Sequence, residues 1–481
     1  QNVNGIAGNS VTGLRSKYIL SENVNNTTRL NFNTYLNTEI GKHVEFMAGA
    51  SYQYQQNHYF RRVNDLLGGD FFVDLNQFAE RDFPSDVLSN QNDLNNPNRL
   101  LRKDDKYGYN YKMTISKAQG WAQAVFKYRK FDYFAAAEVS QTQFRRTGLT
   151  RTGIFPNNSF GESEMQKFTN YSFKGGITYK INGRNYLYVN GAYMTRAPFF
   201  ENVYISPRIR DDVQDNVTSE KIQTIEGGYI LNAPRLKVRV SGYYTRFDDQ
   251  MNVLTFFNDR YNNFTNYAIN NIDKIHFGGE FGFEARVTNT LTINGAASVG
   301  RYYFDSRQDA TVTLNNNAEI LAKETVFANN YRVSGTPQEA YSLGFQYRSP
   351  KFWFVSLTAN FFDQMWLDFN PVRRTYLAVQ DLPQDSEVRS AILAQERLKA
   401  QYTVDFFGGY SYKIPRNWGM GRNAFLVFNL GVNNILNNQN IITGGFEQLR
   451  FDFDDKNPNK FPAKYFYAFG TNFFASVNLR F

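Results

Sequence analysis

Residue types that could perform acid–base chemistry near neutral pH are sparse in this chain. It has three histidines, His43, His58 and His276, and they lie far apart in the sequence. A histidine-dependent hydrolase needs a serine or a carboxylate held beside the imidazole, and no recognisable motif supplies one near any of the three. We expect these histidines to be polar side chains of loops or of an interior. The sequence therefore predicts a protein that is not an enzyme, with a hydrolase as the less favoured alternative.

Carboxylates gather at one place, a run that could suggest a metal site. The run consists of Asp452, Asp454 and Asp455, with Asn457 and Asn459 behind them. Calcium loops space their oxygen ligands regularly around an invariant glycine, and this run lacks that spacing. The chain has no cysteine, so thiolate metal sites and disulfides are excluded. We expect a solvated loop here, with no bound metal and no cofactor.

Arginines beside aromatic residues are the remaining candidates for ligand binding. Arg208 and Arg210 precede two aspartates, and Arg373 and Arg374 lie near Trp366 in another polar stretch. Guanidinium groups next to aromatic rings can hold an anionic or carbohydrate-like ligand. The alternative, which we favour, is that mixed charges keep long loops soluble and pair with one another. These five residues are the candidate substrate-binding residues.

The elements that position these side chains must be strands and turns. The chain has 481 residues, with Phe 45, Tyr 32 and Gly 34, and its net charge is +9. Aromatic residues favour strands, whereas glycine favours turns. No apolar run reaches the length of roughly 18 residues that a membrane-spanning helix needs. Lys and Arg are scattered among acidic residues, so the basic face of a nucleic-acid-binding protein is not expected.

Apolar and polar residues alternate over long segments. From Tyr465 to Phe481 almost every odd position is apolar or aromatic, while even positions include Asn472, Ser476 and Arg480. The same alternation occurs in 236–245, 353–361 and 424–433. Period two indicates strands with one apolar face. These runs are longer than the strands of a soluble sandwich and suit tilted strands that cross a membrane.

Short and long connections alternate along the chain. The short ones include Asn182-Gly183, Asn232-Ala233-Pro234, Thr288-Asn289-Thr290 and Ser349-Pro350-Lys351. The long polar ones cover roughly 57–116, 147–169, 199–221, 248–276, 305–339, 364–401 and 437–464. Outer-membrane barrels join their strands by short periplasmic turns and longer extracellular loops. The sequence therefore predicts an all-β fold, a transmembrane antiparallel β-barrel in a bacterial outer membrane.

Counting strands under this rule gives about fifteen. They cover approximately 27–40, 43–56, 117–128, 131–146, 170–181, 184–196, 222–231, 236–247, 277–287, 291–304, 340–348, 352–363, 402–413, 423–434 and 465–481. An odd number cannot close a bacterial single-chain barrel, and an open edge in lipid would leave backbone groups unpaired. We therefore expect residues 1–26 to be part of an extracellular loop and 27–481 to be the C-terminal portion of a larger barrel.

Three stretches resemble TonB-dependent receptors, the 22-stranded active importers of the outer membrane. The first contains Arg196-Ala197-Pro198, followed by Glu220 and then by Glu226-Gly227. The second is Asn429-Leu430-Gly431-Val432-Asn433-Asn434, which is similar to a motif of the penultimate strand of that family. The third is the terminal Phe481, similar to the signal read by the barrel-assembly machinery.

The resemblance covers essentially the whole chain and implies its function. The fifteen strands would be the last fifteen of 22, and a plug domain, absent from this chain, would contact the TonB complex. The whole protein would take up an unidentified nutrient, and a surface lipoprotein is a possible partner. The alternative is a passive porin-like, structural or adhesive barrel. The substrate cannot be inferred, because specificity in such barrels lies in the loops.

Overall fold

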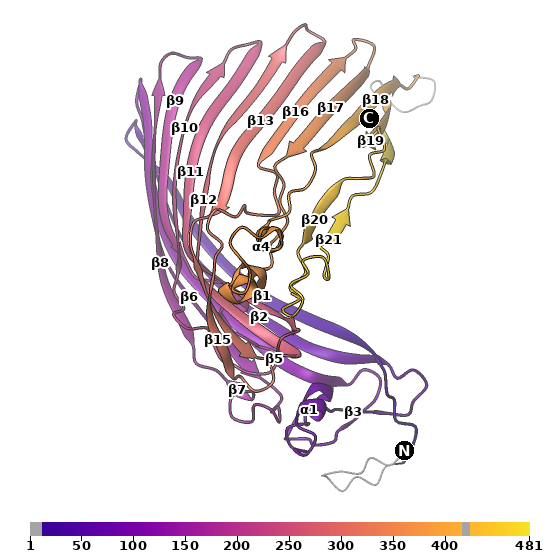
Figure 1. The fold of residues 1–481 in the computed structure, drawn as a ribbon. Coiled ribbons are helices and arrows are strands. Elements are labelled where there is room, and N and C mark those ends of the chain that lie inside the picture. The colour runs from indigo at the N-terminus through magenta and orange to yellow at the C-terminus, as the bar shows by residue number, and fades with distance from the viewer. Residues whose placement is uncertain (1–11, 416–423) are drawn as a thin grey trace.

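The computed structural model describes residues 12–415 and 424–481, and most of its regular structure is antiparallel β-sheet. One sheet of 18 strands forms a tall curved wall (Figure 1). Helices among the described residues are short, and none is long and apolar enough to cross a membrane.

Fifteen strands of this sheet make up the wall, each paired antiparallel with the next in the chain. They are β1 (Leu20–Ile40), β2 (Val44–Asp65), β5 (Lys106–Lys127), β6 (Phe131–Gly148), β8 (Gln166–Lys180), β9 (Asn185–Arg196), β10 (Glu220–Asn232), β11 (Leu236–Asn258), β12 (Asn263–Arg286), β13 (Leu291–Phe304), β16 (Glu339–Arg348), β17 (Trp353–Asp363), β18 (Gln401–Lys413), β19 (Phe425–Asn433) and β22 (Asn472–Arg480). The all-β antiparallel fold and the strand order predicted from the sequence are confirmed.

Connections at the two ends of the wall differ, as the sequence predicted. One end, the turn end, carries tight turns, such as the one after Ile40, where Gly41 has a φ of 68°. Glycine adopts this left-handed backbone conformation at the lowest cost, because it has no Cβ. The opposite end, the loop end, carries the long connections. These contain β3 (Phe72–Val73), β4 (Leu100–Leu101), β7 (Gly161–Glu162), β14 (Gln308–Leu314), β15 (Ile320–Val326), α1 (Gln77–Asp82), α2 (Phe200–Val203), η1 (Pro371–Arg374), α3 (Tyr376–Val379) and α4 (Glu387–Leu393).

Several strands extend further into the loop end than the sequence predicted. The first begins at Leu20 rather than at residue 27, so only the part of 1–26 before Leu20 could be loop, and residues 1–11 lie outside the described residues. Its polar segment stays in register with β2, for example Asn25 opposite Tyr59. Backbone pairing needs no apolar alternation, which is why these extensions left no periodic signal. The predicted start of another strand, residue 423, also lies outside the described residues.

The last predicted strand, 465–481, is wrong as one continuous element. The chain forms β21 (Lys464–Tyr467), which pairs with β20 (Ile442–Phe446) in a separate hairpin, and β22 begins only at Asn472. At the break, the Thr471 hydroxyl donates to the Asn434 carbonyl at 2.8 Å, and the Thr471 N–H donates to Asn437 Oδ1 at 3.1 Å. These bonds to the preceding loop replace strand pairing while the alternation of the sequence continues.

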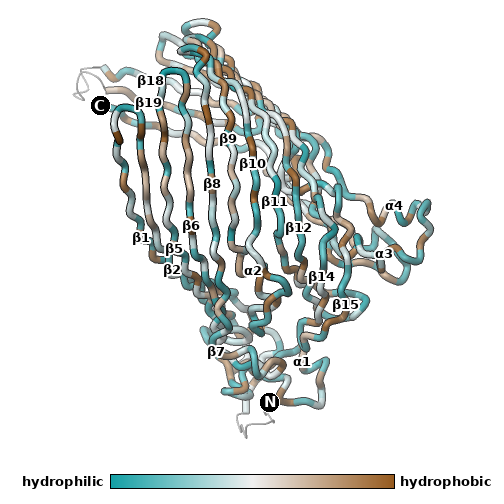
Figure 2. The backbone as a smooth tube through the Cα atoms, turned by 90° about the vertical axis from the view of Figure 1, so that its left-hand side faces the viewer, coloured by the Kyte–Doolittle hydropathy of each residue, from teal (hydrophilic) through white to brown (hydrophobic). Residues whose placement is uncertain are grey.

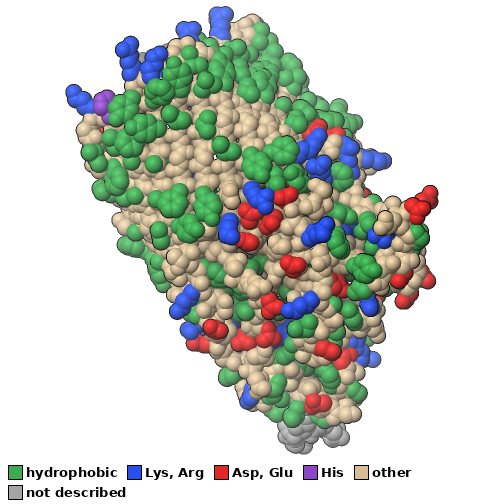
Figure 3. Space-filling view, turned by 60° about the vertical axis from the view of Figure 1, so that its left-hand side comes forward, with side chains coloured by type: hydrophobic (Ala, Val, Ile, Leu, Met, Phe, Trp, Pro, Cys, Tyr) green, Lys and Arg blue, Asp and Glu red, His purple; other side chains and the backbone are tan. Residues whose placement is uncertain are grey.

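The two faces of the wall differ in chemistry. Outward positions carry large apolar side chains that remain exposed, such as Phe281 at 43%, Tyr341 at 38% and Phe361 at 41%. Figure 2 shows apolar residues recurring along the strands toward the turn end. Figure 3 shows hydrophobic and uncharged side chains on this outer face, with Lys and Arg at the turn end and charges of both signs toward the loop end. This distribution is typical of a barrel wall that faces lipid.

The wall is not closed over the described residues. Among these, β1 pairs only with β2, and β22 pairs only with β19. Both edges are well exposed, and along β22 Phe473 is 76% and Val477 62% exposed. An open apolar edge of this kind invites pairing with further strands.

Candidate functional site

A cavity of about 1050 Å³ opens among the segments of the loop end. Its walls come from the extended parts of β1, β2 and β5, from the segments around α1 and α2, and from the ends of β12 and β14. These segments are far apart in the sequence, and the extended strands bring them together. The cavity is the candidate ligand-binding site.

Tyrosines form one side of the cavity. Tyr107, Tyr109 and Tyr111 occupy alternate positions of β5 and therefore share one face of the strand. Tyr59, from the neighbouring β2, stacks on Tyr111 with ring centroids 5.1 Å apart and ring planes 17° apart. A packed aromatic face of this kind can support the flat side of a sugar or another ring.

Two arginines lie over these rings. The Arg61 guanidinium lies 5.5 Å from the Tyr107 ring and 5.4 Å from the Tyr109 ring, and that of Arg208 lies 5.4 Å from the Tyr109 ring. Within the described residues neither arginine has a carboxylate within ion-pair distance. Glu201 is an acidic residue that also lines the cavity. The guanidinium groups therefore remain available to an anionic or hydroxyl-rich ligand.

A buried arginine holds the loop that carries Arg208. Arg146 of β6 is 1% exposed, and its Nε donates to the Pro207 carbonyl at 2.6 Å while its Nη1 donates to the Ser159 carbonyl at 2.9 Å. The Tyr204 hydroxyl accepts a hydrogen bond from the Arg146 backbone N–H at 3.2 Å. These bonds fix the segment after α2 against the wall and so set the position of Arg208.

Arg210, the second arginine predicted in this loop, does not line the cavity. It is 1% exposed, its Nη2 donates to Thr313 Oγ1 at 3.3 Å, and its guanidinium lies 5.0 Å from the Phe155 ring. Asp212 lies 3.3 Å from its Nε. Burial lowers the pKa of Arg210, and Asp212 partly opposes that effect. The structure thus places Arg210 in a packed contact between two loops.

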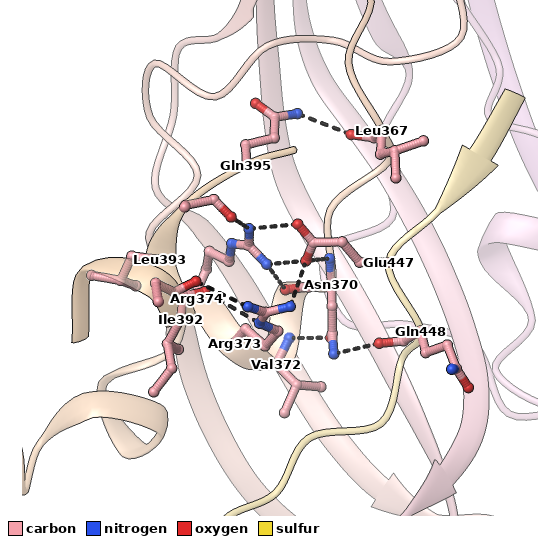
Figure 4. Close-up of polar contacts among 12 residues, drawn as sticks. Leu367, Asn370, Val372, Arg373, Arg374, Ile392, Leu393, Gln395, Glu447 and Gln448 are labelled. Atoms are coloured by element: carbon pink, nitrogen blue, oxygen red, sulfur yellow. Dashed lines mark hydrogen bonds and ion pairs between the residues drawn. The ribbon is translucent and has the colours of Figure 1, made fainter. Parts of the chain in front are cut away.

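Arg374 joins two other loops at a buried ion pair (Figure 4). Its side chain is fully buried, and both terminal nitrogens donate to the carboxylate of Glu447, that of Nη2 at 2.8 Å. The same carboxylate accepts the Asn370 N–H at 3.0 Å, and Asn370 Nδ2 donates to the Gln448 carbonyl at 2.9 Å. We call Asn370, Arg374 and Glu447 the loop clasp. It connects the η1 segment with the segment after β20.

The neighbours of the loop clasp are also engaged in internal contacts. Arg373 lies 3.7 Å from Glu447 and donates to the carbonyls of Ile392 and Ala391 at 3.2 and 3.1 Å. Burial is the main cause that lowers the pKa of Arg373. Trp366 is half-buried and forms a backbone bridge with Arg397. Of the five predicted binding residues, Arg208 alone lines the cavity, and the structure does not bring the five together.

The motif residues lie on β9 and β10. Arg196 Nη2 forms an ion pair with Glu220 Oε2 at 2.5 Å, and Arg196 and Glu220 are backbone partners. Ala197 packs against a buried cluster of the loop end. Pro198 comes two residues after Arg196, the last residue of β9, and has no N–H with which to extend the strand ladder. This part of the motif therefore ends one strand and ties it to the next.

Glu226, in the second part of the motif, lies on the concave face of the wall, opposite to the exposed Ile225. Glu226 accepts hydrogen bonds from the Tyr188 hydroxyl at 2.6 Å and from Arg239 Nη2 at 2.9 Å. Gly227 lies beside it in β10, where a Cβ would meet only ordinary contacts at 3.4 Å or more. At Gly228 a Cβ would lie 2.8 Å from the Tyr188 ring, so the glycine makes room for that tyrosine.

The histidines and the acidic run occupy separate places. A ring nitrogen of His43 lies 2.9 Å from the Lys127 carbonyl at the turn end, and one of His58 lies 2.7 Å from Asn110 Oδ1. His276 packs on Tyr302 with ring centroids 4.6 Å apart. Asp452 pairs with Lys460 at 2.8 Å. In residues 12–415 and 424–481 no cluster of His and acidic side chains could hold a metal ion.

Several residues of the cavity and the loop clasp escaped the sequence analysis. The alternation of Tyr107, Tyr109 and Tyr111 is visible in the sequence and could have marked an aromatic strand face. Arg61 and Glu447 carry no local signal, because their partners lie far away in the chain. The terminal Phe481, which the sequence predicted to be the signal for barrel assembly, follows directly after β22 and is 86% exposed.

Comparison with known proteins places this architecture in a family. No curated protein matched the chain. Among solved structures it resembles the copper transporter OprC (10% identity, 94% of this chain and 56% of that one, TM-score 0.55). It also resembles the unliganded ferric citrate transporter FecA (12%, 96% and 55%, TM-score 0.56) and the ferric yersiniabactin uptake receptor FyuA from Yersinia pestis (12%, 96% and 55%, TM-score 0.55).

The chain thus spans about half the length of the solved structures that it matches. At these identities the likeness shows the fold. The family model described as TonB dependent receptor-like, beta-barrel, matches residues 2–435. The resemblance inferred from the sequence motifs is confirmed, and the chain belongs to the TonB-dependent receptor β-barrel family.

Proposed function

We propose that this chain is the barrel wall of an outer-membrane receptor that imports a nutrient actively, and that the cavity at the loop end first binds the nutrient. The cavity carries the proposal, because it presents two arginines without acidic partners among the described residues beside a tyrosine face. Family membership supports the transport role. Under this proposal the loop end is extracellular and the turn end periplasmic.

The complete barrel would contain strands beyond this chain. Unpaired backbone groups cost several kcal/mol each in lipid, and β1 and β22 each have one partner strand within the described residues. Further strands between these edges would close the wall. We propose that the chain is the C-terminal portion of such a barrel, with a plug domain elsewhere in the protein.

The proposed partners follow from this arrangement. The TonB complex would act through the plug, the barrel-assembly machinery would read the strand that ends at Phe481, and a surface lipoprotein could cover the loops. Solved structures with the same fold are titled as transporters of copper and ferric citrate and as an uptake receptor for ferric yersiniabactin. The cavity here suits an anionic ligand that carries rings or hydroxyl groups, since guanidinium groups and tyrosine rings line it together.

Binding to the purified whole receptor would test the cavity. The probes are ferric citrate, trigalacturonate and the neutral maltotriose, and the variant is Arg61→Ala/Arg208→Ala. Loss of charge-assisted hydrogen bonds should weaken the anionic probes roughly 10- to 100-fold. Arg102→Ala is the matched control, because Arg102 is exposed and does not line the cavity. Equal affinity for the anionic and neutral probes would contradict the assignment of the cavity.

Active import needs its own test. Cells that lack TonB should not take up the probe that binds. Cells that contain TonB, and whose only copy of the receptor carries Arg102→Ala, should still take it up. Uptake that is independent of TonB would instead favour a passive porin-like barrel.

A further inference from the structure

A groove crosses the outer face of the wall, on the side away from the ligand cavity. It has a volume of about 400 Å³ and runs over β1, β2, β5, β6 and β8. Small side chains form its floor, namely Ala50, Ala118 and Gly120, and larger ones, including Phe32 and Val139, border it. The register confirms that these residues share the outer face, with Ala50 opposite Gly120 and Gly120 opposite Val139.

The depth of the groove places it in the outer leaflet of the membrane. β5 ends at the turn end with Lys127, and a tilted strand crosses the hydrocarbon in about 9–11 residues. Ala118 and Gly120 therefore lie within the hydrocarbon but toward its extracellular side. This step rests on the membrane placement given under the proposed function. Lys112, on the same face of β5, lies beyond the hydrocarbon at the level of lipid head groups.

Three cations lie above the groove on the same face. Lys112 is two positions beyond Thr114, which pairs with Arg145 of β6. Lys167 of β8 pairs with Gln143, two positions from Arg145. Outward side chains at such diagonal positions lie roughly 7–8 Å apart. Lys112 and Lys167 are therefore each a diagonal neighbour of Arg145, and the three cations form one row above the apolar groove, with Arg145 in the middle.

The charges of these three cations are not balanced within the protein. Arg145 forms an ion pair with Glu162 at 2.6 Å. Neither Lys112 nor Lys167 has an ion pair within the part of the chain that the structure describes. Polar side chains line the end of the groove nearest the cations, where Thr169 Oγ1 donates to Gln141 Oε1 at 2.8 Å. An apolar slot below an excess of positive charge matches a lipid with acyl chains and an anionic head group.

We propose that this groove and its three cations bind one phosphorylated lipid of the outer leaflet. Acyl chains would lie over Ala118 and Gly120, and a phosphate group would lie between Lys112, Arg145 and Lys167. The polar side chains between these two levels would face the sugar or glycerol part of the head group. Such a lipid would cover the wall where small side chains leave it hollow.

Native mass spectrometry of the whole receptor would test the proposal. The probes are hexa-acylated lipid A bisphosphate and the same lipid without phosphates. We expect the bisphosphate to bind at least about tenfold more tightly, and Lys112→Ala/Lys167→Ala to weaken it roughly 10- to 30-fold without affecting the dephosphorylated lipid. Gly120→Phe should weaken both lipids about tenfold by filling the groove.

Matched controls separate site binding from general effects. A Cβ at Gly120 meets nothing within 4 Å, so Gly120→Phe should fold. Gly242 is also outward in β11, where a Cβ would make its nearest contact at 3.8 Å, and Gly242→Phe should leave binding unchanged. Equal binding of the two lipids, or equal losses in the Gly120 and Gly242 variants, would overturn the proposal. Because no nutrient is involved, this result is independent of the test of the ligand cavity.

Discussion

Removing the charge of Glu447 should open the loop clasp without unfolding the wall. Glu447→Gln keeps the size of the side chain but leaves Arg374, which is fully buried, without its counter-charge. Breaking a buried ion pair by changing one partner costs about 3–5 kcal/mol. Arg373, 3.7 Å from the same carboxylate, would add to the uncompensated charge. The η1 segment and the segment after β20 should therefore separate far more often.

Hydrogen exchange on the whole receptor measures this opening locally. A cost of about 3–5 kcal/mol corresponds to exchange that is roughly 10²–10⁴-fold faster in 364–400 and 437–463, with β9 to β13 unchanged. Asp363→Asn is the matched control, because Asp363 pairs with Arg397 in the same region at 2.8 Å but both side chains are partly exposed. An exposed pair contributes at most about 1 kcal/mol. Equal exchange in the two variants would refute the reasoning, as would faster exchange throughout the wall.

Three further changes test other parts of the structure. Gly228→Val should destabilise the barrel, because a Cβ at Gly228 would lie 2.4 Å from a backbone carbonyl. On gels, the variant should therefore shift from the folded to the unfolded band at a lower temperature, whereas Gly227→Val should have little effect. Burial raises the pKa of Glu324, so the stability that this group contributes is full below its unfolded pKa and is lost as the pH rises through its folded pKa. Glu324→Gln should therefore stabilise the β14–β15 hairpin at neutral pH and remove this pH dependence, as measured by hydrogen exchange at about pH 5 and about pH 8. Arg196→Ala should destabilise the ends of β9 and β10 by about 3 kcal/mol in denaturant unfolding, because the nearly buried Glu220 then loses its cation and keeps only the 3.5 Å hydrogen bond from Gln250 Nε2.

The sequence predicted the strands well where apolar and polar residues alternate. Alternation in segments such as 236–245 fixes which residues face outward, since a shift of one position would move every apolar side chain to the other face. It failed where the strands extend into the loop end or where the alternation does not follow the strand boundaries. The polar start of β1 carries no alternation, and the alternation after Tyr465 continues across a break at Thr471.

The candidate site was harder to predict than the wall. Arg208 lines the cavity as a sequence-based candidate, but Arg210 and Arg374 are buried among partners from distant segments. The sequence of a loop shows that it contains an arginine, but it does not show whether a carboxylate such as Glu447 will lie beside that arginine in the folded protein. Arg61 was missed for the same reason, since its role depends on rings contributed by the neighbouring strand.

By itself, then, the sequence determined the all-β wall, the order of its strands, the difference between its two ends and its family. These properties depend on neighbours along the chain, through a period of two residues and through the lengths of the connections. Only the tertiary structure decided which arginines stay accessible, how the loops enclose the cavity, and where cations lie above a groove in the outer face. Each of these depends on strand register and loop packing, which join residues that are far apart in the sequence and leave no local pattern.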